Sequence, residues 1–285
     1  MTEQHILRLV RDTLSEVYPP GEAKAIGRLL LEVGFGVTQT DIYLDKVRYF
    51  SPEEELRLRE MLRRLRQHEP IQYVLGEADF DGLTLLVKPG VLIPRPETAE
   101  LVRWAASEVS PYAHILDVGT GSGCIALALA HRLPHSDVTA WDLSTDAIRI
   151  AQANAWRLKK DVAFCQCDLM VAAFEGSDEP RPTYDLIISN PPYVCQSERK
   201  EMERNVLDYE PDSALFVPDS DPLCYYRALV RLSVRRMRSG GLLMVEINRR
   251  YGAAVAELFV SAGLRAVELR KDTFGNDRMV KGVCP

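Results

Sequence analysis

The sequence predicts an α/β protein in which a small helical domain precedes a doubly wound, mostly parallel sheet. In the first part of the chain, apolar residues recur only at helical spacing. A short central stretch is rich in β-forming and turn residues, and the remainder alternates apolar strands with amphipathic helices. Such alternation is typical of a parallel sheet covered by helices on both faces. We therefore expect three parts, at 1–70, 71–93 and 94–285.

The first part, 1–70, is expected to form a helical bundle. Its apolar residues recur three or four positions apart in three runs, Ile6 to Val17, Ile26 to Val33 and Leu58 to Leu65. Ser51 and Glu54 match the S-x-x-E capping box, and Pro52 suits a first helical turn, so a helix is expected to begin there. The arginines of this helix suit either a solvated face balanced by glutamates or a docking surface for an acidic partner.

Residues 71–93 are expected to form a β-hairpin linker, since turn residues interrupt β-rich stretches at Gly76, at Asp81-Gly82 and at Pro89-Gly90. Seven strands should follow, at 114–118, 138–142, 162–168, 184–190, 241–247, 264–272 and 277–284. Helices are expected between them at 125–133, 147–158, 222–238 and 251–262. The last two strands leave no room for a helix between them, so the last strand should be antiparallel to its neighbours.

Composition excludes several classes of protein. No run approaches the roughly 18 apolar residues of a membrane-spanning helix, and the start of the chain is typical of an amphipathic helix rather than a signal peptide. We expect a cytoplasmic protein without a membrane partner. The net charge of −6 disfavours affinity based on nucleic-acid phosphates, so no direct nucleic-acid binding is expected. Six cysteines without a C-x-x-C pair indicate reduced thiols and no metal site, and nothing requires more than a monomer.

A glycine-rich loop follows the first strand of the expected sheet. In "LDVGTGSGCIALALA", Gly119, Gly121 and Gly123 lie between that strand and the next helix. Glycines at this point allow a tight turn and let the backbone approach a ligand at the positive end of the helix. The G-x-G-x-G spacing differs from the dinucleotide fingerprint G-x-G-x-x-G, so the loop alone indicates a nucleotide-type ligand without choosing it.

Acidic residues end the next two expected strands. Asp142 comes roughly 20 residues after the loop, where a carboxylate can accept hydrogen bonds from both hydroxyls of a ribose. Asp168 is placed to meet the edge of an adenine, and Leu169 is available to pack on the ring. Glycines for close packing and acids as helix caps would explain each feature singly. That interpretation requires three coincidences at the edge where open sheets bind ligands.

The fourth strand is followed by "NPPY", which comprises Asn190, Pro191, Pro192 and Tyr193. The prolines fix the turn and remove two backbone donors, which leaves a rigid cluster of acceptors. The Asn190 side-chain oxygen and the Pro191 carbonyl can each accept one hydrogen of a planar NH2 group, and Tyr193 can hold its plane. A turn without function is the alternative, but the position beside a ligand crevice favours a site.

This cluster suits the methylation of an amide or exocyclic amine. Such a nitrogen is a poor nucleophile because its lone pair is delocalised, and acceptors on both N–H groups stabilise the positive charge that develops on it. Orientation toward the methyl group supplies much of the remaining acceleration. No strong base is needed first, and no His or Glu stands beside the motif in the chain. S-adenosylmethionine (SAM) therefore suits the loop better than a nicotinamide cofactor does.

Along nearly its whole length the chain resembles the bacterial-type glutamine N5-methyltransferases that modify the Gly-Gly-Gln loop of class I peptide chain release factors. The motifs that carry the resemblance are "PIQYVLGEADFDGL", "VLIPRPETAELV", "LDVGTGSGCIALALA", "NPPYV", "YEPDSALFV", "YYRALV", "GLLMVEI" and "FGNDRMV". Because N-P-P-Y also occurs in DNA and RNA amino-methyltransferases, "LIPRPET" is the run that selects the release-factor family. An enzyme for a ribosomal-protein glutamine, an adenine N6-methyltransferase and a noncatalytic SAM-binding protein are the alternatives.

The resemblance implies a Rossmann-like class I SAM-dependent methyltransferase domain that releases S-adenosylhomocysteine and uses no metal. Residues implied to line the SAM site are Gly119, Thr120, Gly121, Ser122, Gly123, Asp142, Leu169 and Asn190. Residues 190–193 are implied to hold the substrate glutamine, and the N-terminal helices to help grip the release factor. Arg95, Pro96, Glu97 and Thr98 are expected to form one wall of the cleft, although Glu97 equally suits a proline-stiffened helix entry.

The chain departs from the family pattern at three places. Ala99 stands where Glu is common, "PDSDPL" at 218–223 replaces a Gly-rich segment, and Asn248 stands where the family commonly has Gly. These departures leave the roles of 218–223 and 248–251 open and do not touch the core motifs.

Overall fold

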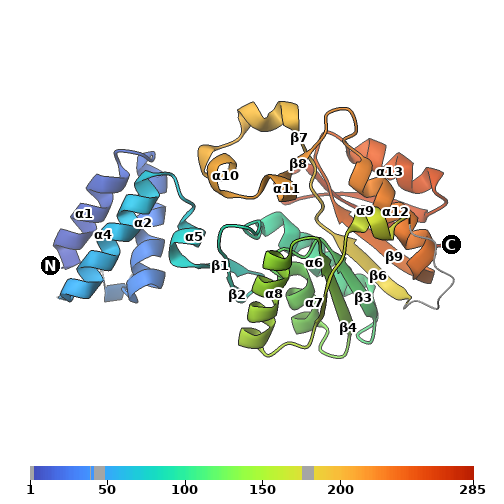
Figure 1. The fold of residues 1–285 in the computed structure, drawn as a ribbon, viewed down its shortest axis with the longest axis horizontal. Helices are drawn as coiled ribbons and strands as arrows, with labels where there is room; N and C mark the ends of the chain where they lie inside the picture. Colours follow the sequence, from blue (N-terminus) through green and yellow to red (C-terminus); the bar gives the residue numbers. More distant parts are fainter. Residues whose placement is uncertain (1–2, 39, 42–48, 175–182) are drawn as a thin grey trace. The chain divides into compact units, whose positions relative to one another are not determined.

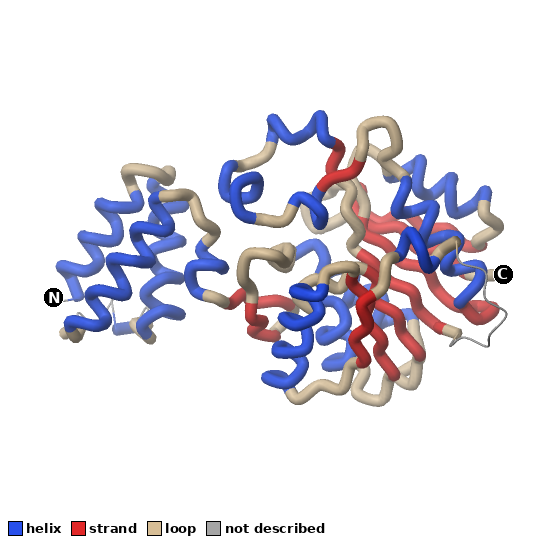
Figure 2. The backbone as a smooth tube through the Cα atoms, in the orientation of Figure 1, coloured by secondary structure: helices blue, strands red, loops and turns tan. Residues whose placement is uncertain are grey.

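A computed structural model describes residues 3–38, 40–41, 49–174 and 183–285 (Figure 1). Figure 2 shows a first part built almost wholly of helices and a second part in which helices surround strands. The chain divides into two compact units, Met1–Glu77 with Glu203–Tyr209, and Ala78–Met202 with Glu210–Pro285. Some of the residues expected in the helical domain, namely 1–2, 39 and 42–48, lie outside the described residues.

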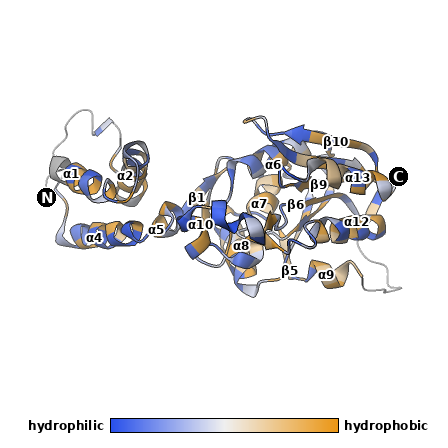
Figure 3. Ribbon diagram, turned by 90° about the horizontal axis from the view of Figure 1, so that it is seen from above, coloured by the Kyte–Doolittle hydropathy of each residue, from blue (hydrophilic) through white to orange (hydrophobic). Residues whose placement is uncertain are grey.

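The described helices of the first unit are α1 (Glu3–Leu14), α2 (Pro20–Phe35), α4 (Pro52–Arg66), the short α5 (Ile71–Leu75) and α10 (Arg204–Tyr209). The capping box predicted at the start of α4 is present: the Ser51 hydroxyl accepts from the Glu54 amide at 3.2 Å, and the Glu54 carboxylate accepts from the Ser51 amide at 2.9 Å. Along α4, hydrophilic and hydrophobic residues alternate in Figure 3. Its buried side chains are Leu58, Met61, Leu62 and Leu65, so α4 packs by one face as its periodicity predicts.

Most arginines of α4 that have a described partner pair with glutamates. The Arg63 guanidinium lies 2.6 Å from the Glu60 carboxylate, and that of Arg64 lies 2.5 Å from the Glu69 carboxylate. Arg64 also donates to the carbonyl of Tyr73 at 3.0 Å. These contacts favour the interpretation of a face balanced by glutamates over that of a docking surface.

The first unit differs in two ways from the helical domain expected at 1–70. Residues 71–75 form helix α5, which ends at Gly76 with a left-handed φ of 83°, instead of opening a hairpin. In addition, α10 belongs to this unit although it is far along the chain, and the Tyr209 hydroxyl donates to the Gln67 carbonyl at 2.8 Å. Hydrophobic periodicity reports local structure, so it could not reveal that a distant segment joins these helices.

The second unit contains the expected hairpin, formed by β1 (Glu77–Phe80) and β2 (Leu83–Leu86). The turn residues Asp81 and Gly82 both have positive φ, 50° and 83°, as a tight two-residue hairpin turn requires. The Asp81 carboxylate forms ion pairs with Arg103 and Arg132, which ties the turn to the helices beside it.

A seven-stranded sheet forms the centre of this unit, with strand order β10-β11-β9-β6-β3-β4-β5. Its strands are β3 (His114–Val118), β4 (Asp137–Asp142), β5 (Ala163–Gln166), β6 (Tyr184–Ser189), β9 (Met237–Glu246), β10 (Arg265–Lys271) and β11 (Asp277–Val283). The five strands from β9 to β5 pair in parallel, and β11 runs antiparallel to both of its neighbours. The predicted mostly parallel sheet with an antiparallel last strand is confirmed.

Helices cover both faces of this sheet. One layer contains α6 (Pro96–Glu108), α7 (Cys124–Arg132) and α8 (Thr145–Leu158), and the other contains α9 (Leu169–Ala172), α12 (Cys224–Arg236) and α13 (Gly252–Ser261). Side chains along β9 alternate between the layers, since Leu242 and Met244 pack with the first and Leu243 and Val245 with the second. This alternation determines which polar side chains at the strand ends can meet.

The segment after residue 193 contains short elements: β7 (Val194–Cys195), the 3-10 helix η1 (Gln196–Glu201), α11 (Asp212–Leu215) and β8 (Phe216–Val217). The two strands pair in parallel, with Val194 opposite Phe216. Because this pair begins one residue after Tyr193, it anchors the chain as it leaves the N-P-P-Y turn.

Candidate active site

The carboxyl ends of β3, β6 and β9 lie side by side. In the register of the sheet, Ser189 is opposite both Val118 and Val245. The next residues along these three strands are Gly119, Asn190 and Glu246, so a glycine loop, an amide and a carboxylate meet at one edge. This is the edge at which open α/β sheets bind their ligands.

The glycine loop is held in a tight turn by its own backbone. The amides of Gly119 and Thr120 both donate to the Trp141 carbonyl at 2.9 Å, and the Gly123 amide donates to the Thr120 carbonyl at 2.8 Å. All three glycines have positive φ, which side-chain-bearing residues rarely adopt. The turn therefore brings the backbone to the edge of the pocket.

The three glycines differ in what a side chain would meet. A Cβ atom on Gly119 or Gly121 would have no heavy atom within 4 Å, so open space lies beside the backbone there. A Cβ atom on Gly123 would lie 3.1 Å from the Ala151 Cβ, because α7 and α8 approach closely at that point. The first two positions suit a ligand against the backbone, whereas the third is required for packing.

Asp142 ends β4 and holds the glycine loop. One carboxylate oxygen accepts from the Gly121 amide at 2.8 Å, and the other accepts from the Ser144 amide at 2.8 Å. Burial raises the pKa of this carboxyl above its usual value. The cap of α8 is Ser144, not Asp142, so a capping role does not account for this acid. Its binding to a ribose stays a prediction.

Asp168 occupies a different local position from the one expected. Strand β5 ends at Gln166, and Asp168 is the N-cap of α9, where its carboxylate accepts from the Met170 amide at 2.7 Å. Leu169 is buried in the core between α9 and the sheet. A helix-capping role therefore does account for Asp168, and the adenine contacts of both residues stay predictions.

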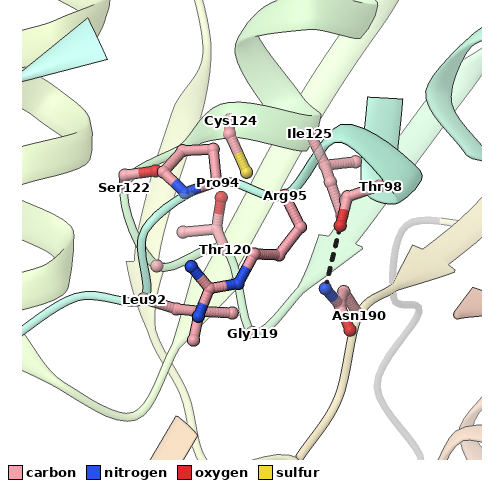
Figure 4. A pocket seen from close by; sticks show the side chains of 11 residues that line it. Leu92, Pro94, Arg95, Thr98, Gly119, Thr120, Ser122, Cys124, Ile125 and Asn190 are labelled. Carbon is pink, nitrogen blue, oxygen red and sulfur yellow. Dashed lines mark hydrogen bonds between the residues drawn. The ribbon is translucent and has the colours of Figure 1, made fainter. Parts of the chain in front are cut away.

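A pocket opens between the glycine loop, the start of α6 and Asn190 (Figure 4). The residues that line it are Leu92, Pro94, Arg95, Thr98, Gly119, Thr120, Gly121, Ser122, Cys124, Ile125 and Asn190. It thus brings together the predicted loop residues 119–122, Asn190, and two residues of the predicted wall, Arg95 and Thr98. The predicted site residues that do not line it are Pro96, Glu97, Gly123, Asp142, Asp168, Leu169 and residues 191–193.

Asp117, which sequence reasoning did not single out, lies fully buried below the loop. Its Oδ2 accepts from the Thr120 hydroxyl at 2.6 Å and from the Ala126 amide at 3.2 Å. Within the described part of the chain, its Oδ1 and the Ser122 hydroxyl have no hydrogen-bond partner. Burial raises the pKa of Asp117 to about 7. An acid inside the run "HILDV" was the signal, because a carboxyl in a buried strand requires a partner.

These features fit SAM. The unpartnered Asp117 Oδ1 and Ser122 hydroxyl below the loop suit the ammonium group of a ligand. The open space beside Gly119 and Gly121 suits an aliphatic part of the ligand that lies against the backbone. The Asp142 carboxylate, which contacts the Gly121 amide, suits hydroxyl groups. Together they supply acceptors for a cationic, hydroxyl-bearing ligand.

Asn190 belongs to a buried hydrogen-bond network. Its Nδ2 donates to the Thr98 hydroxyl at 3.0 Å (Figure 4), and that hydroxyl donates to Glu246 Oε2 at 2.5 Å. The Tyr193 hydroxyl donates to Glu246 Oε1 at 3.0 Å. The network therefore connects the N-P-P-Y turn, the "LIPRPET" run and the end of β9.

Glu246 is not predicted as a site residue from the sequence, because it lies 53 residues after Tyr193 in the chain. No Glu is next to the motif in the sequence, but in the folded protein Glu246 contacts Tyr193 of the motif. The carboxylate lies at the end of the adjacent strand and is 1% exposed. The signal was a Glu at the end of the apolar run "GLLMVEI", where the alternation of β9 directs it toward α6.

Arg95 and Glu97 have separate surroundings. The Arg95 guanidinium lies 2.6 Å from Glu210 Oε1, in the "YEPDSALFV" motif, and lines the pocket. Pro96 begins α6, and Glu97 lies in its first turn, as the helix-entry interpretation expects. A wall role for Glu97 stays a prediction.

Asn248, one of the departures from the family pattern, holds the N-P-P-Y turn. Its Nδ2 donates to the Tyr193 carbonyl at 3.1 Å and to the Glu198 carboxylate at 2.9 Å. Its Oδ1 accepts from the Arg250 amide at 3.0 Å. Pro191 is buried and Pro192 is half-buried, so the turn is fixed from both sides.

The described residues contain neither a cluster suited to a metal ion nor a helix suited to cross a membrane. Across residues 3–38, 40–41, 49–174 and 183–285, no three His, Cys, Asp or Glu side chains are grouped so that they could hold a metal ion. None of the described helices combines the length and the apolar character needed to cross a bilayer.

Two family models match the chain. The PrmC N-terminal domain matches residues 5–76, and the Methyltransferase small domain matches residues 101–208. Among solved structures, the 16S rRNA N2 G1207 methyltransferase of T. thermophilus covers 73% of this chain and 50% of its own, with a TM-score of 0.51 and 17% identity. The human methyltransferase 10 domain containing protein covers 71% of this chain and 88% of its own, with a TM-score of 0.50 and 18% identity. At such identities the likeness shows the fold alone, that of class I SAM-dependent methyltransferases.

Sequence relatives are much closer and cover nearly the whole chain. The release factor glutamine methyltransferase of Bacteroides thetaiotaomicron is 44% identical over 276 residues, which are 96% of this chain and 98% of that protein. The protein of the same name from Flavobacterium psychrophilum is 38% identical over 94% of each chain. That from Lactococcus lactis is 35% identical over 96% of this chain and 98% of its own. This chain therefore belongs to the release factor glutamine methyltransferase family.

Proposed function

We propose that this protein transfers a methyl group from SAM to the side-chain amide nitrogen (N5) of the glutamine in the Gly-Gly-Gln loop of class I peptide chain release factors. SAM, when bound, supplies an electrophilic methyl group on a sulfonium. The observation that carries the proposal is the orientation of Asn190. Its Nδ2 is committed to Thr98, so its Oδ1 is turned away from Thr98 and can accept from a substrate amide.

The N-P-P-Y turn prepares the amide for attack. Asn190 Oδ1 and the Pro191 carbonyl each accept one of the two N–H groups, and Tyr193 holds the plane of the amide. Two acceptors favour localisation of the nitrogen lone pair and stabilise the positive charge that develops as the bond to carbon forms. The alkylated nitrogen is acidic and then releases a proton to solvent, so the reaction requires no base beforehand.

Residues around the loop would hold SAM. The backbone from Gly119 to Gly123 would lie against its methionine part, with Asp117 as acceptor for the ammonium group. Asp142 would bind the ribose hydroxyls, and Asp168 and Leu169 would meet the adenine. No metal takes part, and S-adenosylhomocysteine is the second product.

The N-terminal helices are assigned to gripping the release factor, and Arg95 and Glu97 to one wall of the substrate cleft. The target glutamine has to leave its own loop to enter the pocket, so contacts far from the reacting nitrogen are needed to hold it there. We expect short peptides to be poor substrates compared with the folded factor. The reaction is assigned to the cytoplasm. The protein is assigned to a monomer, and light scattering of the purified protein would check this oligomeric state.

Mass spectrometry of an unmodified release factor incubated with the protein and SAM tests this function. We expect one methyl increment that maps to the loop glutamine and is absent when that glutamine is replaced. Asn190→Ala should abolish turnover while the fold remains, whereas Gln152→Ala, which removes another amide side chain on the exposed side of α8, should be as active as the wild type. Normal turnover by Asn190→Ala would refute the role of Asn190.

The same assay separates the alternative substrates. An increment on a ribosomal-protein glutamine, with none on the release factor, would keep the chemistry and change the target. Methyl label in nuclease-digested nucleic acid would indicate an adenine N6-methyltransferase, which would have to extrude its base into this pocket.

A further inference from the structure

We propose that Glu246 is a positioning residue that sets the orientation of the Asn190 amide through Thr98 and that of the Tyr193 hydroxyl directly. This inference rests on the proposed function, because the orientation matters only if Asn190 Oδ1 accepts from a substrate amide. It adds a residue at the end of β9 that touches no expected substrate atom and acts through its neighbours.

The fold brings Glu246 to this position. Leu242 and Met244 point toward the layer of α6 and α7, so two residues further along β9 the Glu246 side chain points the same way. There it meets Thr98, in the first turn of α6, which is 2% exposed. The register of β6 and β9 brings Asn190 beside Glu246 at the strand ends.

Donor and acceptor chemistry makes the orientation unambiguous. An ionised carboxylate can only accept, so the Thr98 hydroxyl must give its one hydrogen to Glu246, at 2.5 Å. Only lone pairs of Thr98 then face Asn190, which has to present its NH2 group, at 3.0 Å. As a result, Asn190 Oδ1 points away from Thr98 (Figure 4), which leaves an acceptor for the substrate.

The same carboxylate also commits the Tyr193 hydroxyl hydrogen. That hydroxyl donates to Glu246 Oε1 at 3.0 Å, so it can offer only lone pairs to any other group. One buried carboxylate thus turns two side chains of the N-P-P-Y turn into acceptors. For Asn190 this polarity is what the acceptance of a substrate N–H group requires, and for Tyr193 it fixes the hydroxyl of the ring that holds the plane of the amide.

The ionised state of Glu246 depends on the groups that face it. Thr98 and Glu97 face it from α6, Tyr193 from the turn after β6, and Arg278 from β11. Burial raises the pKa of Glu246, and the nearby Glu97 carboxylate raises it further, whereas the two hydroxyl donors and the Arg278 guanidinium lower it. The hydrogen bonds and the arginine therefore support a charge that burial alone would oppose.

Substitutions at Thr98 test whether its hydroxyl carries the effect. Thr98→Ser keeps the hydroxyl and should keep kcat within about threefold, whereas Thr98→Val keeps the shape and should lower kcat about 10²-fold, the usual cost of a misplaced catalytic group. The SAM dissociation constant should stay close to wild type in both. The melting temperature should stay close to wild type in Thr98→Ser and fall in Thr98→Val, because the buried Glu246 carboxylate then loses a donor. Equal kcat values for the two variants would overturn the inference.

Glu246→Gln should likewise lower kcat about 10²-fold, because the Gln nitrogen can donate to Thr98 and reverse the Asn190 amide. Combining it with Thr98→Val should add little, since both act on one hydrogen-bond chain. A loss of kcat that is matched by weaker SAM binding or a lower melting temperature would show a merely structural role and overturn the inference. So would wild-type kcat in Glu246→Gln.

Reversing the donor and acceptor roles along the hydrogen bonds between residues 246, 98 and 190 supplies a rescue test. Asn190→Asp places a carboxylate opposite Thr98, whose hydrogen is already committed to Glu246, so this variant should be almost inactive. In the double variant with Glu246→Gln, the Gln nitrogen can donate to Thr98, which can then donate to the new carboxylate. We expect at least a tenfold gain in kcat over Asn190→Asp, and no gain would overturn the inference. If wild-type protein fails to methylate the release factor, the proposed function itself has failed.

Discussion

The carboxylate of Glu210 lies 2.6 Å from the guanidinium of Arg95, and only 1% of the Glu210 side chain is exposed. The other carboxylate oxygen accepts from the Ile93 amide at 3.1 Å. Glu210 therefore holds both the side chain of Arg95 and the backbone just before it, on the wall of the pocket. Since Tyr209 belongs to the first unit and Glu210 to the second, the chain passes from one unit to the other at this pair.

We expect Glu210→Ala to lower the free energy of unfolding by about 3 kcal/mol, because it leaves a half-buried guanidinium and the buried Ile93 amide without their partner. It should also raise KM for the release factor. Urea unfolding followed by circular dichroism measures the first effect. The matched control is Arg149→Ala, which breaks the exposed pair with Asp146 and should cost less than about 1 kcal/mol. Equal costs for the two variants would contradict the role given to Glu210.

Asn248 gives a second prediction, since its amide holds the Tyr193 carbonyl at 3.1 Å. Asn248→Ala removes this bond and should raise KM for the release factor several-fold, with a stability loss of about 1–2 kcal/mol. Asn248→Asp should be worse, because its carboxylate would face the Tyr193 carbonyl and the Glu198 carboxylate. Steady-state kinetics of the three proteins measure the order, and an Asn248→Asp variant with normal KM would contradict it.

Much of the second unit could be predicted from the sequence. Parallel strands buried on both faces appear as apolar runs, so β3, β4 and β6 agree with the predicted strands to within one residue. The prediction was wrong at the start of β9, which begins at Met237 instead of Gly241 and includes the last two residues of the predicted helix 222–238, because its first residues are mostly exposed and give no apolar signal. Residues 119–122 and Asn190 meet at the pocket because strand ends in such a sheet share one edge.

What could not be predicted depends on contacts between distant segments. No periodicity reports that Glu246 meets Thr98 and Tyr193, or that Glu210 pairs with Arg95 across more than a hundred residues. The predicted strand end at Asp168 was wrong because β5 is an edge strand with mostly exposed residues, so the sequence shows no clear apolar boundary there. Buried polar residues were the recoverable signal, since each requires a partner.

The glycine loop gives a third prediction, in which two alanine substitutions have different effects. Gly121 has a φ of 55° and open space where a side chain would go, whereas Gly123 has a φ of 85° and would bring a Cβ atom within 3.1 Å of Ala151. Both should lose about 1–2 kcal/mol from the left-handed conformation. Gly123→Ala should lose more because α7 and α8 must separate, and Gly121→Ala should weaken SAM binding more than its stability loss explains. Calorimetric titration and thermal unfolding of each variant measure these effects.

Asp117 gives a fourth prediction, one about pH. Burial raises the pKa of Asp117 from its ordinary value of 3.8, which it has in the unfolded chain, to about 7 in the folded protein. Folding therefore favours the protonated carboxyl. The folded state then binds more protons than the unfolded chain between these values, and this group's contribution to stability is lost as pH rises through about 7.

Replacing Asp117 by Asn removes that loss, because an amide does not ionise and its oxygen can still accept from the Thr120 hydroxyl and the Ala126 amide. We expect the melting temperature of ligand-free Asp117→Asn to exceed that of the wild type by several degrees at pH 8, with a smaller difference at pH 5. SAM binding should weaken at pH 8, since the variant lacks the charge that would meet the ammonium group. Thermal unfolding and calorimetric titration at both pH values measure the two effects. A variant that is less stable than the wild type at pH 8 would show that the ligand-free protein favours the charged form of Asp117. Equal SAM binding at pH 8 would show that Asp117 does not meet the ammonium group.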